Sequence, residues 1–125
     1  MKNSSIEQKR KVLLNMTQQA RDLRAKKVKE AEEQGKTNEA LFWASRTINS
    51  IIIEYFYKKN GNTRFETFNK WKNEGMSVIK GEKAYVIWGR PLGAQYEEKG
   101  EEPDKDTEKY FPISHIFSNK QVKKQ

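Results

Sequence analysis

Residues 64–93 have the sequence RFETFNKWKNEGMSVIKGEKAYVIWGRPLG, and this stretch decides the fold. Thr67 can cap a short helix, because a threonine hydroxyl can accept a hydrogen bond from a backbone amide of the first helical turn. Two runs rich in strand-forming residues follow at 77–79 and 84–88. They flank the turn 80–83, which contains a glycine. The pattern predicts a short helix and then two short strands around a tight turn.

Upstream of this stretch, a charged helix is predicted over residues 5–34. Two pairs of residues have capping-box spacing at its start, Ser4 with Glu7 and Ser5 with Gln8. Apolar residues recur at helical spacing along the segment and form a narrow stripe. The members of this stripe are Ile6, Leu13, Met16, Ala20, Leu23 and Ala31.

A second helix is predicted over residues 41–57, after a cap at Thr37 or Asn38. The segment 51–57, IIIEYFY, is rich in residues that favour strands, so a strand is the competing prediction there. We favour the helix, because the helical spacing of apolar residues begins at Leu41 and continues without a break.

Downstream, residues 96–108 form an acidic segment with seven acidic residues against two lysines. Such a charged segment predicts a mobile loop. A further strand is predicted over 110–117, and Pro112 near its start predicts an edge position or a bulge. The basic residues 119–125 are expected to fray.

Together these elements predict an α+β fold with two long N-terminal helices, a short helix and a small antiparallel β-sheet. A chain of 125 residues has the size of one domain, so we expect a single domain over 1–125. The bulky residues expected in its core are Trp43, Phe42, Phe65, Phe68, Trp71 and Trp88.

The composition narrows the class of protein. There is no cysteine, which excludes disulfides, cysteine nucleophiles and thiolate metal sites. The N-terminus lacks the apolar core of a secretory signal, and the apolar runs of the sequence, such as 51–53, are all far shorter than a membrane span. We therefore expect a cytoplasmic protein without a membrane partner. The net charge of +8 favours a polyanionic partner.

The sequence offers little for catalysis. The one histidine, His115, lies within the predicted final strand, and we expect it to be a surface or half-buried strand residue. The acidic segment lacks the alternating order of a calcium-binding loop, and no phosphate-binding glycine loop or nucleophile motif is present. We expect no enzymatic activity, no metal and no cofactor.

Basic residues interleaved with aromatic ones predict nucleic-acid binding. Between residues 58 and 90 there are eight basic residues and three acidic ones. Proteins that bind single strands use such mixtures, because cations contact phosphates while aromatic rings stack on bases. Tyr85 and Trp88 fall on opposite faces of a strand, so at most one should point into the core. The candidate phosphate contacts are Arg64, Lys70, Lys72, Lys80, Lys83 and Arg90, and the candidate stacking residues are Trp71 and Trp88.

The same stretch resembles the N-terminal domain of the antirestriction protein ArdC family. The resemblance covers about residues 40–122 and leaves the charged helix outside the family pattern. Phe65 stands where the family usually has tryptophan, and Ser118 where it usually has asparagine. The matching positions are Thr67, Phe68, Gly75, Val78, Lys80, Gly81, Glu82, Lys83, Phe117 and Gln121.

This resemblance implies the α+β fold of the family's N-terminal domain. It also implies binding to single-stranded DNA, in proteins of plasmids, phages and conjugative elements. Larger members of the family carry a metallopeptidase-like domain with a zinc motif, which one histidine cannot supply, so we do not expect that activity here.

Two alternatives remain open at this point. The chain could be a protein-interaction or dimerisation module that uses the apolar stripe of helix 5–34. The basic helix could instead bind double-stranded nucleic acid or RNA.

Overall fold

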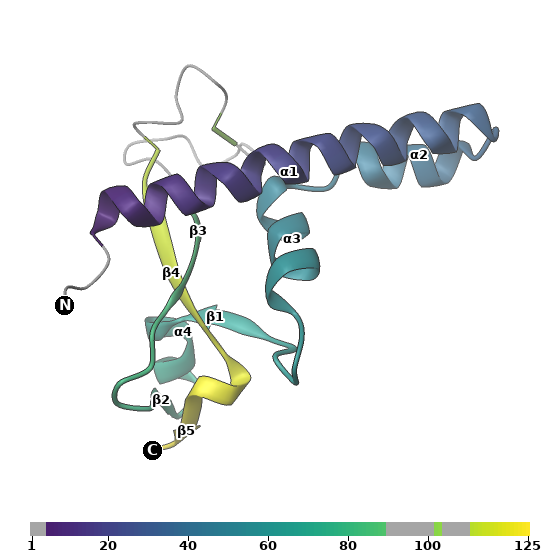
Figure 1. Ribbon diagram of the computed structural model, residues 1–125. Helices are drawn as coiled ribbons and strands as arrows, with labels where there is room; N and C mark the ends of the chain where they lie inside the picture. The colour runs from purple at the N-terminus through teal and green to yellow at the C-terminus, as the bar shows by residue number, and fades with distance from the viewer. Residues whose placement is uncertain (1–4, 90–101, 104–110) are drawn as a thin grey trace. The chain divides into compact units, whose positions relative to one another are not determined.

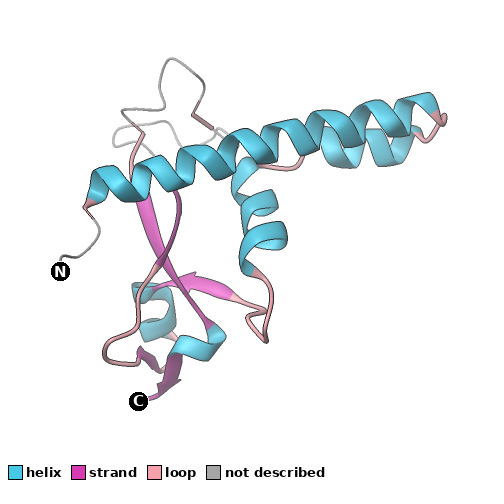
Figure 2. Ribbon diagram, viewed as in Figure 1, coloured by secondary structure: helices cyan, strands magenta, loops and turns pink. Residues whose placement is uncertain are grey.

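The computed structural model describes residues 5–89, 102–103 and 111–125, and it shows an α+β protein (Figure 1). The chain forms two compact units, Met1–Ile52 and Ile53–Gln125. The described part of the first unit is helical, and the described strands belong to the second (Figure 2). The predicted fold class is therefore confirmed.

The first unit begins with the predicted charged helix, α1, which covers Ile6–Glu33. Its start is fixed by a capping box in which the Ser5 hydroxyl accepts from the Gln8 amide at 3.1 Å. The Gln8 side chain accepts in turn from the Ser5 amide at 3.2 Å. The helix ends before Gly35, whose φ of 72° is readily adopted by a residue without a side chain. The structure forms the second of the two predicted capping boxes, and Ser4, which belongs to the first, lies outside the described residues.

Helix α2, Thr37–Ala44, packs beside α1 (Figure 1). The chain then leaves the helical conformation and resumes it in α3, Ile48–Ile52. The side chain of Thr47 accepts a hydrogen bond from the Ser50 amide at 3.0 Å, which caps the new helix. A single π-helical turn, η1, follows at Ile53–Tyr57.

The second long helix was thus predicted correctly as helical, but the prediction that it is continuous is wrong. The segment 51–57 is helical, so the alternative of a strand is wrong. The interruption at residues 45–47 divides the predicted helix, because the Thr47 cap begins a new one there. One long helix, rather than two, precedes the strands. No helix in the described part of the chain is long and apolar enough to cross a membrane.

The buried residues of the first unit include Leu13 and Ala20 from the predicted stripe, and Trp43 from α2. Phe42 is 58% exposed, so its predicted place in the core is wrong. Ala40 and Trp43 turn inward, and the neighbouring Phe42 is carried to another side of the helix because successive helical residues are about 100° apart.

The second unit contains a three-stranded antiparallel sheet with the order β1-β4-β3 (Figure 2). Its strands are β1, Phe65–Thr67, β4, Ile113–Ser118, and β3, Tyr85–Trp88. Val86 lies opposite His115 in this sheet. His115 is half-buried, as expected for a residue within a strand.

Two further strands form a separate antiparallel pair. They are β2, Met76–Val78, and β5, Val122–Lys124. The strands predicted around the turn 80–83 both exist, but they pair with β5 and β4 rather than with each other. The C-terminal residues, predicted to fray, form β5, so that prediction is wrong.

The final predicted strand is the central strand of its sheet. Pro112 lies just before β4 rather than in an edge strand or a bulge, so that prediction is wrong. The carbonyl oxygen of Pro112 accepts a hydrogen bond from the Gly89 amide at 2.8 Å. Strand β1 was not predicted, because three residues carry too little periodicity. The predicted acidic loop lies outside the described residues, apart from 102–103.

An aromatic cluster supports the sheet of the second unit. The ring of Tyr57 lies 5.8 Å from that of Phe65 and 4.8 Å from that of Tyr85, between centroids. The Tyr57 hydroxyl donates to the carbonyl oxygen of Val86 at 2.6 Å. Burial raises the pKa of Tyr57 to about 12. This hydrogen bond satisfies a carbonyl of the edge strand β3.

Candidate nucleic-acid interface

The short helix α4, Phe68–Asn73, carries the first group of candidate residues. The Thr67 hydroxyl accepts from the Lys70 amide at 3.2 Å and caps the helix as predicted. The Trp71 ring is buried, and its nitrogen donates to the carbonyl oxygen of Phe117 at 2.9 Å. This anchoring leaves Phe68 exposed, at 51%, together with Lys70 and Lys72, so the predicted core position of Phe68 is wrong.

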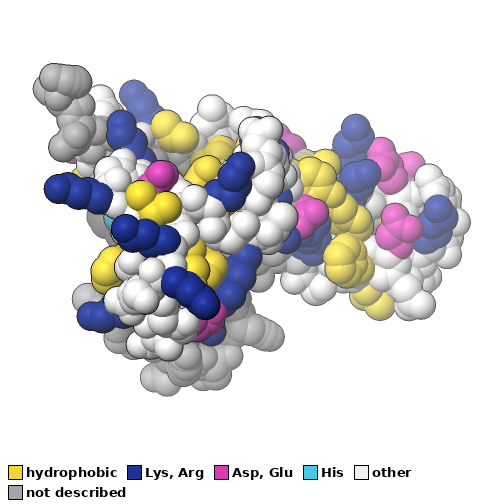
Figure 3. All heavy atoms as spheres, turned by 90° about the horizontal axis from the view of Figure 1, so that it is seen from below, with side chains coloured by type: hydrophobic (Ala, Val, Ile, Leu, Met, Phe, Trp, Pro, Cys, Tyr) yellow, Lys and Arg dark blue, Asp and Glu magenta, His cyan; other side chains and the backbone are white. Residues whose placement is uncertain are grey.

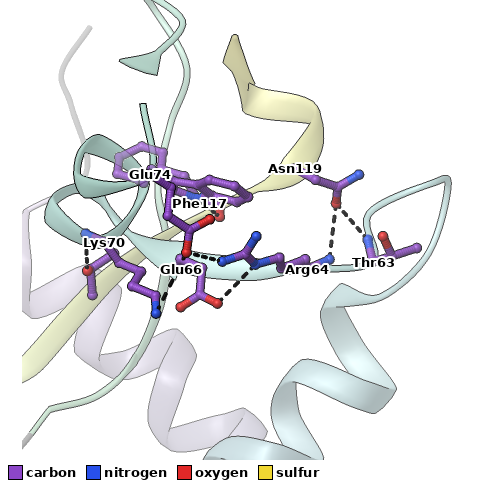
Figure 4. Close-up of polar contacts among 9 residues, drawn as sticks. Thr63, Arg64, Glu66, Lys70, Glu74, Phe117 and Asn119 are labelled. Carbon is purple, nitrogen blue, oxygen red and sulfur yellow. Dashed lines mark hydrogen bonds and ion pairs between the residues drawn. The ribbon is translucent and has the colours of Figure 1, made fainter. Parts of the chain in front are cut away.

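An ion-pair network occupies two of the candidate cations (Figure 4). Arg64 bonds Glu74 at 2.6 Å and Glu66 at 3.1 Å, and Lys70 lies 3.7 Å from Glu74. The hydrogen bonds to Glu74 and then Glu66 raise the pKa of Arg64, and the bond from Arg64 lowers the pKa of Glu74. The guanidinium carbon of Arg64 lies 4.6 Å from the centre of the Trp71 ring. Arg64 and Lys70 are therefore partly neutralised within the protein.

Three other candidate lysines have no such partner. Lys72, Lys80 and Lys83 are exposed, and none of them forms an ion pair with another residue that the structure describes. Lys80 and Lys83 bracket a turn in which the Glu82 amide donates to the carbonyl oxygen of Ile79 at 3.1 Å. Their positive charges are available to an anionic ligand.

Strand β5 adds two lysines that the sequence did not single out. Lys123 lies opposite Ser77, and Lys124 lies opposite Met76. Both are exposed and form no ion pair within the described part of the chain. Successive strand residues point to opposite faces, so each face of the pair receives one lysine. These two lysines could have been predicted as candidate residues only if the pairing of β2 with β5 had been known.

Lys72, Lys80 and Lys83 are together called the lysine surface below, and Lys123 and Lys124 are left out of it because they lie on opposite faces of the β2-β5 pair. Figure 3 views the molecule from the side on which β2 and β5 lie in Figure 1. Lysine and arginine side chains stand beside hydrophobic ones on that face. This mixture is the one that single-strand binders use.

The structure contradicts the predicted stacking residues. Trp71 and Trp88 are each 4% exposed, so neither presents a free ring face to a base. The ring of Trp88 packs edge to face against Phe111, with 6.0 Å between centroids. Tyr85 is half-buried in the aromatic cluster. An exposed ring near Lys72 is that of Phe68, four residues away on α4.

The remaining candidate residue, Arg90, lies outside the described residues. Within the described ranges, no group of three histidine, aspartate or glutamate residues could hold a metal ion.

A comparison with protein families finds a match. The family model of the N-terminal domain of anti-restriction factor ArdC matches residues 7–118. The match includes nearly all of α1, so our expectation that this helix lies outside the family pattern is wrong. No curated protein and no solved structure matches the chain. Because the match spans both units and most of the sequence, the chain belongs to the family of the N-terminal domain of anti-restriction factor ArdC.

Proposed function

We propose that this domain binds single-stranded DNA through the lysine surface and Phe68, without catalysing a reaction, in a protein of a plasmid, phage or conjugative element. The observation that carries the proposal is the set of exposed lysines without acidic partners among the described residues, beside an exposed aromatic ring. A lysine without an acidic partner gains more free energy on binding a phosphate than a paired lysine does, because no ion pair has to be broken first.

Phe68 and Lys72 stand four residues apart on α4, so they lie on the same side of the helix. A base stacked on Phe68 would place its phosphate within reach of the flexible Lys72 side chain. A ring face accepts any base, so this arrangement binds with little sequence preference.

The test is fluorescence anisotropy of a labelled oligothymidine titrated with the protein at several salt concentrations. If about four phosphates are neutralised, log K should fall against log salt with a slope near −3. A flat salt dependence, or equal affinity for a duplex of the same length, would contradict the proposal.

A matched pair of variants tests the location of the site. The triple change Lys72→Gln, Lys80→Gln and Lys83→Gln should weaken binding and flatten the slope by about 2. The control carries the same charge change on the first unit, at exposed positions: Lys26→Gln, Lys29→Gln and Lys36→Gln. Equal losses in both variants would show a general effect of net charge.

A second candidate is self-association through the first unit. The predicted stripe of α1 is a poor interface, because Leu13 and Ala20 are already buried in the single chain. The adjacent residues Leu41 and Phe42 are 63% and 58% exposed, which favours α2 as the contact instead. Light scattering over a range of concentrations tests this candidate, and a constant monomer mass would exclude it.

A further inference from the structure

Gln121 is a buried amide that joins two parts of the second unit. It is 8% exposed and belongs to the short 3-10 turn η2, Asn119–Gln121. Its side-chain oxygen accepts from the Ser118 amide at 2.8 Å. Its side-chain nitrogen donates to the carbonyl oxygen of Lys83 at 2.8 Å and to the Glu82 carboxylate at 3.2 Å.

The backbone of Gln121 holds the other side of the same loop. Its carbonyl oxygen accepts from the Ile79 amide at 2.8 Å. Gln121 therefore contacts the loop both before Lys80 and at Lys83. Gly81, between them, has a φ of 90°, a conformation that side-chain-bearing residues rarely adopt. The loop has one internal turn bond, and Gln121 supplies the contacts that fix its two ends.

Asn119 plays the equivalent role for a second loop (Figure 4). Its side-chain oxygen accepts from the amides of Thr63 and Arg64, at 2.8 and 3.1 Å. Its side-chain nitrogen donates to the carbonyl oxygen of Gly61 at 3.2 Å. One short turn, residues 118–121, thus forms hydrogen bonds with two loops that lie far away in the sequence. It is called the clamp turn below.

We infer that the clamp turn is a positioning element for nucleic acid, in which Gln121 sets the place of Lys80 and Lys83. The inference rests on the proposed function. Gln121 itself is covered and need not touch DNA. Its effect is to hold the loop in one conformation, so that two lysines meet successive phosphates without a further loss of backbone freedom.

The loss of conformational freedom explains why a buried amide suits this task. A loop that samples many conformations must be ordered when a ligand binds, and that ordering reduces affinity. A buried side chain whose donors and acceptor are all used holds the loop before the ligand arrives. Replacing its donor leaves the carbonyl of Lys83 without that partner.

The test compares Gln121→Glu with Gln125→Glu by oligothymidine anisotropy. Both variants remove one positive net charge from the protein, and Gln125 is exposed. The carboxylate that Q121E introduces would keep the acceptor for the Ser118 amide and lose the donor to Lys83. We expect Q121E to flatten the salt slope by about 1 to 2 more than Q125E, since two phosphate contacts weaken. Gln121→Met, which removes the amide without adding charge, should flatten the slope in the same direction.

A double-mutant cycle separates positioning from a general loss of structure. In the Q121M background, Lys83→Gln should cost clearly less affinity than in the unmodified protein, whereas Lys72→Gln should cost the same in both. Thermal melts establish that each variant is folded at the temperature of measurement. Equal coupling to Lys72 and Lys83, or equal slopes for Q121E, Q121M and Q125E, would overturn the inference.

The proposed function can survive that failure. If the triple lysine variant weakens binding while the Gln121 variants do not, the lysine surface binds DNA and the clamp turn is only structural. If the triple lysine variant has no effect, the proposed site itself is wrong.

Discussion

The indole nitrogen of Trp71 donates a hydrogen bond to the carbonyl oxygen of Phe117 at 2.9 Å, and this bond ties α4 to the central strand β4. Trp71→Phe keeps an aromatic ring and removes the donor. We expect the free energy of unfolding to fall by about 1–3 kcal/mol, because a part-buried carbonyl loses its partner and the smaller ring leaves a void. Urea denaturation followed by circular dichroism measures the change. An unchanged midpoint would mean that the bond contributes nothing.

The three tryptophans should be poor reporters of DNA binding. Trp43, Trp71 and Trp88 are 7%, 4% and 4% exposed. Collisional quenching requires contact with the ring, so acrylamide should quench the folded protein far less than the urea-unfolded protein. A single-stranded oligonucleotide should likewise cause little quenching by stacking, even where anisotropy detects binding. Strong quenching by a short oligonucleotide would show that a buried ring becomes exposed on binding.

Phe68→Ala tests the exposed ring. A base stacked on an aromatic side chain contributes about 1–3 kcal/mol, so the dissociation constant for oligothymidine should rise about 5- to 150-fold. The thermal midpoint should change little, since half of the side chain is already exposed. The matched control is Phe42→Ala, an exposed phenylalanine of the first unit, which should leave DNA binding unchanged. Equal losses in both variants would remove the stacking role.

Glu74→Gln should strengthen binding to DNA. Glu74 pairs with both Arg64 and Lys70, so its removal makes the charge of Lys70 available to phosphates and leaves Arg64 paired with Glu66 alone. We expect the slope of log K against log salt to become steeper by about 1. Glu39→Gln makes the same charge change at an exposed position of α2 and should have a smaller effect. If the two variants bind equally, the ion-pair network does not restrain these cations.

The raised pKa of Tyr57 predicts that the protein loses stability at high pH. Its pKa is about 12 in the folded protein and 10.0 ordinarily, so the folded state holds the proton more tightly. The contribution to stability is complete below pH 10 and is lost as the pH rises towards 12. Between pH 9 and 11.5, the unmodified protein should lose up to about 2 kcal/mol more than Tyr57→Phe. If the unmodified protein and Tyr57→Phe lose the same free energy of unfolding between the two pH values, as measured by urea denaturation, the burial of this hydroxyl is contradicted.

Local signals in the sequence predicted the helices well. Ser5 with Gln8 and Thr67 lie next to the helices they cap, so residues a few positions apart carry the information. The short strands β1 and β5 were missed, because each depends on a partner far away in the chain: Thr67 pairs with Ile116, and Val122 pairs with Val78. The assignment of 51–57 to a helix depended on the helical spacing of apolar residues that begins upstream at Leu41.

The candidate site was predictable in its charges and not in its geometry. Lys72, Lys80 and Lys83 follow from composition, because lysine is rarely buried. The neutralisation of Arg64 requires Glu74, which lies on a different element. The side of α4 that faces inward could not be predicted, since six residues fit either a buried Phe68 or a buried Trp71. The lysines of β5 depend on a pairing that no local pattern reveals.

The long sequence separation between β1 and β4 has a consequence for the order of events during synthesis. β1 and β3 both pair with β4, and the loop at 61–64 is bonded to Asn119. Residues 66–117 must therefore leave the ribosome after Phe65 before Phe65 can pair with Ser118. The contacts between α1 and α2 are closer in sequence and can form early, whereas the sheet of the second unit must wait for β4 to emerge. We expect the strands and loops of the second unit to be the part of the nascent chain most exposed to proteolysis.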